Sequence, residues 1–179
     1  MGERKTNADE AGLVPTQELV KKGSPNGKAD ELLLTIYGVT VRDMEPYFTG
    51  LAGQVELFAG GVVEQLPKEW GSDPHDPETY RSMKFRNMVK LREAFTNALA
   101  AEKPAAIEGL SIDVWEITVA EMEQVDREYL PGMMAKYAVK VPKHWGAADE
   151  VDTYMNLPYP VWLAAQDVLL EAIKDLGKN

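Results

Sequence analysis

Four side chains that could bind a metal or transfer a proton gather in one short stretch of the chain. They are Asp73, His75, Asp76 and Glu78. Their oxygens and nitrogens suit a divalent cation. The spacing matches no closed metal site, and Pro74 and Pro77 are typical of a loop that leads into a helix. A small metal-dependent enzyme using these residues therefore stays an alternative, while the favoured prediction assigns the chain no metal and no cofactor.

Other patterns for catalysis are weak. His144 is the second of two histidines, and no Ser, His and Asp arrangement or glycine-rich phosphate loop can be assembled around it. The sequence has no cysteine, which excludes disulfides, thiolate zinc sites and cysteine nucleophiles. We therefore predict no catalytic residue and expect that the protein is not an enzyme.

Basic side chains follow the acidic stretch at helical spacing. Arg81, Arg86 and Lys90 could share one face of a helix and contact an acidic or phosphate-bearing partner. The alternative is a solvated face that pairs with the protein's own carboxylates. We predict these three residues as a second partner-binding surface.

Large apolar side chains form the other candidate surface. Met133 and Met134 precede a tryptophan loop, and Tyr159 and Trp162 lie in a proline-rich stretch near the end of the chain. Methionine and aromatic residues adapt well to a protein partner. They could equally fill the core. We predict all four as partner-binding residues.

These candidates lie within a sequence that repeats itself. Residues 66–71 and 141–146 share the pattern Pro-Lys-x-Trp-Gly, 75 positions apart, and residues 39–45 resemble residues 117–123 at a spacing of 78. The repeats predict a tandem duplication of one unit. We expect a flexible tail over residues 1–29, a first unit over 30–101, a linker over 102–109 and a second unit over 110–179.

Each unit is predicted to be a short strand or hairpin with about three helices, in a mostly helical α+β fold. Strands are expected near residues 31–37 and 110–115. Thr40 and Thr118 each begin a helix in the capping-box pattern, and the second of these helices should reach about Tyr129. Pro46 should kink or shorten the first. An amphipathic helix closes each unit.

Composition narrows the choice of partners. The formal net charge is -10, which disfavours general binding to nucleic acid or to an anionic membrane surface. No apolar run approaches the roughly 20 residues of a membrane span. The start of the sequence lacks the apolar segment of a signal peptide. We therefore predict a cytoplasmic protein with no membrane contact, and nucleic acid is an unfavoured partner.

The second unit resembles a known family. Residues 117–123 begin a helix after a strand, and residues 156–162, Asn-Leu-Pro-Tyr-Pro-Val-Trp, begin the last helix. This order is similar to that of the tail assembly chaperones of tailed bacteriophages, in which an "lT-x-x-E" helix start follows a hairpin and a short "lp" segment precedes the final helix. The resemblance is best over residues 110–176 and looser over 31–100. It implies a small, acidic, mostly helical protein of the host cytoplasm that binds a helical tail-length protein without catalysis.

These observations lead to one functional prediction. We expect a non-enzymatic protein-binding or assembly factor that shields apolar helices of a partner, as a phage tail assembly chaperone would. A small metal-dependent enzyme and a virion structural protein, in which the two units mimic a dimer, remain as alternatives. The partner, the oligomeric state and a common core for the two units are left open.

Overall fold

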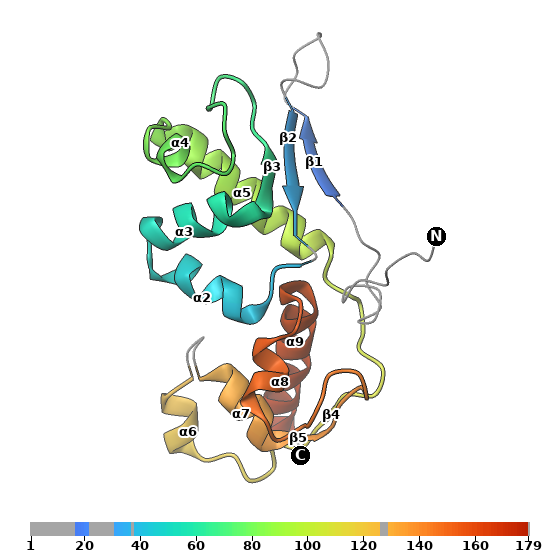
Figure 1. The fold of residues 1–179 in the computed structure, drawn as a ribbon. Coiled ribbons are helices and arrows are strands. Elements are labelled where there is room, and N and C mark those ends of the chain that lie inside the picture. The colour runs from blue at the N-terminus through green and yellow to red at the C-terminus, as the bar shows by residue number, and fades with distance from the viewer. Residues whose placement is uncertain (1–16, 22–30, 37, 126–128, 179) are drawn as a thin grey trace, which may run out of the picture.

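The computed structural model describes residues 17–21, 31–36, 38–125 and 129–178. Within these ranges the protein is mostly helical and contains two small antiparallel sheets, which confirms the predicted α+β class. Figure 1 shows the helices and strands formed by the described residues up to 101 in the upper part of the molecule, and those formed by the later described residues below. We refer to these two parts as the first half and the second half.

The first half contains a three-stranded sheet with helices beside it. Its strands pair in the order β1–β2–β3. The elements are β1 (Gln17–Lys21), β2 (Glu31–Thr35), α2 (Val41–Thr49), α3 (Leu51–Leu57), the π-helical turn η2 (Phe58–Val62), β3 (Val63–Gln65), α4 (Pro77–Arg81) and α5 (Phe85–Ala101).

The second half has a similar order of elements but no counterpart of η2, and its first strand is shorter than β2. Two helices separate the strands of its two-stranded sheet, and two more follow, of which the last is long. The elements are β4 (Ser111–Ile112), α6 (Val119–Glu123), α7 (Leu130–Tyr137), β5 (Ala138–Lys140), α8 (Val151–Met155), α9 (Tyr159–Asp175) and the 3-10 turn η3 (Leu176–Lys178).

Part of the predicted tail belongs to the sheet. β1 pairs antiparallel with β2, from Gln17 opposite Thr35 to Lys21 opposite Glu31. The prediction of a flexible tail over residues 1–29 is therefore wrong for these five residues, because the backbone groups on that side of β2 take them as a partner strand. The remainder of the predicted tail lies outside the described residues.

One predicted helix differs in length from the expectation, while the other is short, as predicted. α6 begins at the capping box of Thr118 but ends at Glu123, well before Tyr129. In the first half, α2 contains Pro46 and continues to Thr49, where Gly50 ends it with φ of 142°. α2 is therefore short, as expected of a helix that contains a proline. The next helix, α3, begins directly after that glycine.

The two halves repeat the same strand pairing. β2 and β3 change register between Leu33 and Leu34, and β4 and β5 change register between Ser111 and Ile112. The second irregularity lies 78 residues after the first, which is also the spacing between residues 39–45 and residues 117–123. A bulge that recurs at the matched place indicates the same local fold twice.

The Pro-Lys-x-Trp-Gly stretch also forms the same turn twice. The N–H groups of Trp70 and Trp145 donate to the carbonyl of the proline three residues earlier, over 2.9 Å and 3.0 Å. The next glycine has a positive φ in both copies, 152° at Gly71 and 117° at Gly146, where a side chain would be strained. These matched features support the predicted duplication, which itself stays a prediction.

One hydrophobic core extends through both halves. Phe58 and Phe95 of the first half are fully buried, as are Tyr154, Trp162 and Leu169 of the second, and all belong to one continuous cluster. The halves also share backbone hydrogen bonds. The two halves therefore fold around a common core, which answers a question that the sequence left open.

Candidate partner-binding groove

A groove lies between the two halves, where α2 of the first half meets α7, α8 and α9 of the second. Its volume is about 870 Å³, and apolar side chains predominate around it. The described lining residues are Val41, Glu45, Phe48, Thr49, Leu130, Pro131, Met155, Tyr159, Trp162, Leu163 and Gln166. A hollow of this size and composition can hold large apolar side chains of another molecule.

α2 supplies one wall of the groove through its amphipathic face. Val41, Met44 and Phe48 recur at helical spacing, so one face of the helix is apolar. The first two are buried, whereas Phe48 is 39% exposed and its ring lies 6.1 Å from that of Tyr159. Phe48 therefore forms the accessible apolar edge. Our sequence prediction missed it, although this spacing is a signal that could have found it.

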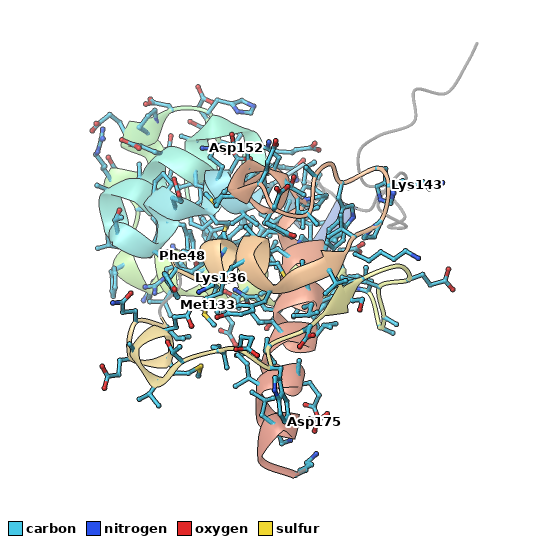
Figure 2. The ribbon with its side chains drawn as sticks, turned by 90° about the horizontal axis from the view of Figure 1, so that it is seen from below. Phe48, Met133, Lys136, Lys143, Asp152 and Asp175 are labelled. Carbon is cyan, nitrogen blue, oxygen red and sulfur yellow. The ribbon has the colours of Figure 1, made fainter. Side chains whose placement is uncertain are left out.

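The structure places the four predicted apolar residues at different depths. Tyr159 and Trp162 both line the groove, with 9% and 2% of their surface exposed. Met133 and Met134 are fully buried in α7, so they lie in the core rather than on a surface. Figure 2 labels Met133 on the same side of the molecule as Phe48. Because they are buried, the two methionines are not available for direct contact with a partner.

The predicted basic residues separate into two sets. Arg86 and Lys90 of α5 line a second hollow of about 380 Å³, together with Lys84 and the acidic residue Glu69. Arg81 is not among its lining residues, and it forms an ion pair with Glu78 on α4. The helical spacing thus brings Arg86 and Lys90 to one surface but leaves Arg81 paired with a carboxylate of its own helix.

The acidic stretch before α4 forms local hydrogen bonds. The Asp73 carboxylate accepts from the His75 N–H and the Asp76 carboxylate accepts from the Glu78 N–H, each over 2.9 Å. Asp76 thereby caps the first turn of α4. Among the described residues, no three His, Cys, Asp or Glu side chains converge as they would around a metal ion.

An electrostatic cluster joins α6 to α7. Lys136 and the Tyr137 hydroxyl donate to the Glu121 carboxylate, which also accepts the Thr118 N–H over 2.9 Å. Hydrogen bonds lower the pKa of Glu121 from 4.5 to about 2. The largest effect comes from the Lys136 ammonium, followed by the Thr118 N–H and the Tyr137 hydroxyl. The same contact raises the pKa of Lys136. The carboxylate is thus held in its charged form and acts as a fixed tie between two helices.

Two buried tyrosines anchor the loops that follow the tryptophan turns. The Tyr80 hydroxyl donates to the Pro74 carbonyl over 2.6 Å, and the Tyr154 hydroxyl donates to the Ala148 carbonyl. Burial raises the pKa of both phenols, to about 12 for Tyr154, and the nearby Asp149 adds to that effect. Both phenols are therefore neutral hydrogen-bond donors, which suits structural anchors rather than a proton-transfer role.

The site as a whole combines an apolar groove with a charged hollow. Among the described residues, the groove has apolar walls and one carboxylate, the hollow on α5 has three basic residues and Glu69, and the polar clusters form hydrogen bonds within the protein. Within the described ranges, no helix is both long and apolar enough to span a membrane. The chain matches no family model, no curated protein and no solved structure.

Proposed function

We propose that this chain is a non-enzymatic protein-binding factor that shields an apolar helix of a partner during assembly. The observation that carries the proposal is the groove of about 870 Å³ between α2 and α9. Apolar side chains line most of it, and Phe48 remains 39% exposed at its edge. An amphipathic helix binds by laying its apolar face into such a groove.

Charge indicates which kind of helix fits. Glu45 is the one charged side chain among the described residues that line the groove, and the whole chain has a net charge of -10. A partner helix with Lys or Arg beside its apolar face would be attracted, whereas an acidic helix would be repelled. The resemblance to tail assembly chaperones makes a helical tail-length protein the first natural partner to test.

The polar clusters favour binding over catalysis. The carboxylates of Asp73 and Asp76 are engaged by backbone N–H groups, and that of Glu121 by Lys136 and Tyr137. Each of these residues therefore has a structural explanation. The groove itself presents neither a nucleophile beside a base nor a pair of carboxylates among its described lining residues.

Binding of a designed peptide tests the groove directly. The probe is a fluorescein-labelled amphipathic helix of Leu and Lys, and a scrambled peptide of the same composition provides the sequence control. Fluorescence anisotropy should show that Phe48→Asp weakens binding of the amphipathic peptide by about tenfold or more, because a charge replaces the exposed apolar edge.

Leu170→Asp is the matched control variant. Leu170 lies on α9 outside the groove and is 46% exposed, so the same change of charge there should leave binding unaltered. The proposal is contradicted if the scrambled peptide binds equally well, or if the two variants weaken binding to the same extent.

A further inference from the structure

A short backbone junction joins the two halves. The Val41 N–H donates to the Leu157 carbonyl over 3.1 Å, and the Tyr159 N–H donates to the Val39 carbonyl over 2.7 Å. Thr40 lies between Val39 and Val41, and Pro158 lies between Leu157 and Tyr159. These two middle residues form an isolated antiparallel bridge with each other. The segment that enters α2 therefore pairs with the segment that enters α9.

Each partner in this junction has a counterpart in the other half. The segment 117–119 enters α6 behind a capping box, as 39–41 enters α2. The segment 83–85 enters α5, which has 17 residues, as 157–159 enters α9, which also has 17. We call residues 117–119 the α6 edge and residues 83–85 the α5 edge.

The two counterpart edges are unpaired. The N–H groups of Val119 and Phe85 and the carbonyls of Ile117 and Met83 form no backbone hydrogen bond with the described residues. Their side chains are also open. Val119 is 76% exposed and Phe85 is 60% exposed, whereas Val41 and Tyr159, at the matched positions of the junction, are 8% and 9% exposed.

The two free edges do not meet within one chain. If a two-fold axis related the two halves, the α6 edge would pair with the α5 edge. The junction would then occur twice in the molecule, as it does in an isologous contact. Only one such bridge occurs among the described residues. Figure 1 shows α6 at one end of the molecule and α4, which leads into α5, at the other. The relation between the halves is therefore head to tail.

From these observations we infer that copies of this chain associate head to tail, with the α5 edge of one copy pairing with the α6 edge of the next. The Val119 N–H donates to the Met83 carbonyl of the second copy, and the Phe85 N–H of that copy donates to the Ile117 carbonyl. The contact reproduces the internal junction, and because it is heterologous it can continue into a ring or a filament.

The charges around the two edges are complementary. Lys84, Arg86 and Lys90 lie around the α5 edge together with one acidic residue, Glu69, and the positions that match the three basic residues in the second half are Pro158, Pro160 and Ala164. Around the α6 edge, residues 110–125 contain four acidic residues and no Lys or Arg, and one of the four, Glu121, pairs with Lys136 of α7. The internal junction thus lies among buried apolar side chains, Val39, Val41 and Leu157, while the external contact is charged and weakens as salt increases.

Proline at the first position of a helix removes the required N–H without breaking the helix. Phe85→Pro blocks the α5 edge and Val119→Pro blocks the α6 edge. The preceding residues have ψ of 132° at Lys84 and 158° at Thr118, which proline accepts. Val151→Pro is the matched control, because Val151 begins α8 where Pro77 begins α4 in the first half.

Sedimentation velocity at about 50 mM salt tests the inference. The unaltered chain and Val151→Pro should form larger species as concentration increases. Each edge variant alone should associate at least about tenfold more weakly. An equimolar mixture of Phe85→Pro and Val119→Pro should form a heterodimer and nothing larger, because each variant retains one working edge.

Two further measurements complete the test. Raising the salt to about 500 mM, or replacing Arg86 and Lys90 with Glu, should weaken association of the unaltered chain by about tenfold or more. Equal thermal midpoints of all proline variants show that folding is retained. A chain that stays monomeric at low salt, or edge variants that associate like the control, would overturn the inference.

Discussion

Glu121 is the residue with the most closely defined electrostatic role in the described part of the chain. Donors from three residues, Thr118, Lys136 and Tyr137, hold its carboxylate, and its pKa falls to about 2. The capping box of Thr118 could be read from the sequence, because it is a local pattern. The contacts with Lys136 and Tyr137 could not be predicted, since these residues lie 15 and 16 positions away and only the packing of α7 brings them in.

Replacing Glu121 with Gln should change the pH dependence of stability. A pKa lowered from 4.5 to about 2 means that the charged carboxylate stabilises the folded state above pH 4.5 and loses this effect as the pH falls toward about 2. The stability difference between the two proteins should therefore be constant at neutral pH and shrink below 4.5. Urea unfolding across this range measures it. A difference that does not vary with pH would contradict the assigned role.

Trp162 and Phe48 should respond differently to truncation, although both line the groove. Trp162 is 2% exposed, so Trp162→Ala should destabilise the protein by about 4 kcal/mol. Phe48 is 39% exposed, so Phe48→Ala should cost only about 1 kcal/mol. Chemical denaturation compares the two directly. Equal losses would show that Phe48 is a core residue and would weaken the case for an accessible groove.

At the scale of elements, α2 and α3 are held in unusually close contact. Gly53 of α3 lies so near α2 that an added Cβ would be 1.8 Å from the Pro46 carbonyl oxygen. No side chain fits there, and the obstacle is backbone that cannot rotate away. The sequence indicated that Pro46 would disturb the first helix, but the need for glycine at position 53 became apparent only from the crossing of the two helices.

Gly53→Ala should therefore separate these helices and destabilise the protein by about 3 kcal/mol. Gly60→Ala is the control, because nothing lies within 4 Å of a Cβ added at Gly60. The control should be nearly neutral. Thermal unfolding of both variants checks the prediction, which would fail if Gly53→Ala proved as stable as the control.

At the scale of the whole molecule, the two halves share one hydrophobic core. Their buried residues form a single cluster, and the junction at Val41 and Tyr159 adds two backbone hydrogen bonds. Arg42 and Asp152 form an ion pair across the same boundary over 2.7 Å, although both are exposed and the pair adds little. Figure 2 labels Asp152 on the side of the molecule where this boundary lies, away from Lys143.

A common core predicts one cooperative unfolding transition. Separation of the halves would expose Val39, Leu157 and Tyr159, which are all buried in the intact chain, so neither half should melt first. Differential scanning calorimetry should give a calorimetric enthalpy equal to the van't Hoff enthalpy. Two resolved transitions would show instead that the halves are independent domains.

The proposed assembly also belongs to this scale. Groove residues and edge residues are different sets, so binding of a partner helix and head-to-tail association can be lost separately. A chain that repeats its own internal junction between copies would also suit the alternative of a virion structural protein. Size and symmetry of the assembled species would distinguish that role from a chaperone that stays small.

The local features could be predicted from the amino-acid order alone. It indicated the mostly helical α+β class, the capping boxes at Thr40 and Thr118, and two tryptophan turns of one design, because these depend on neighbours within a few residues. It also placed basic residues at helical spacing at Arg86 and Lys90.

Tertiary structure decided which of those features are accessible. Met133 and Met134 looked like contact residues but are buried, while Phe48 became the exposed edge of a groove that neither half forms alone. It also decided that one pair of matched edges is joined while the other is open. Such outcomes depend on how distant surfaces meet, and hydrophobic spacing along the chain carries no information about which apolar face will find a partner.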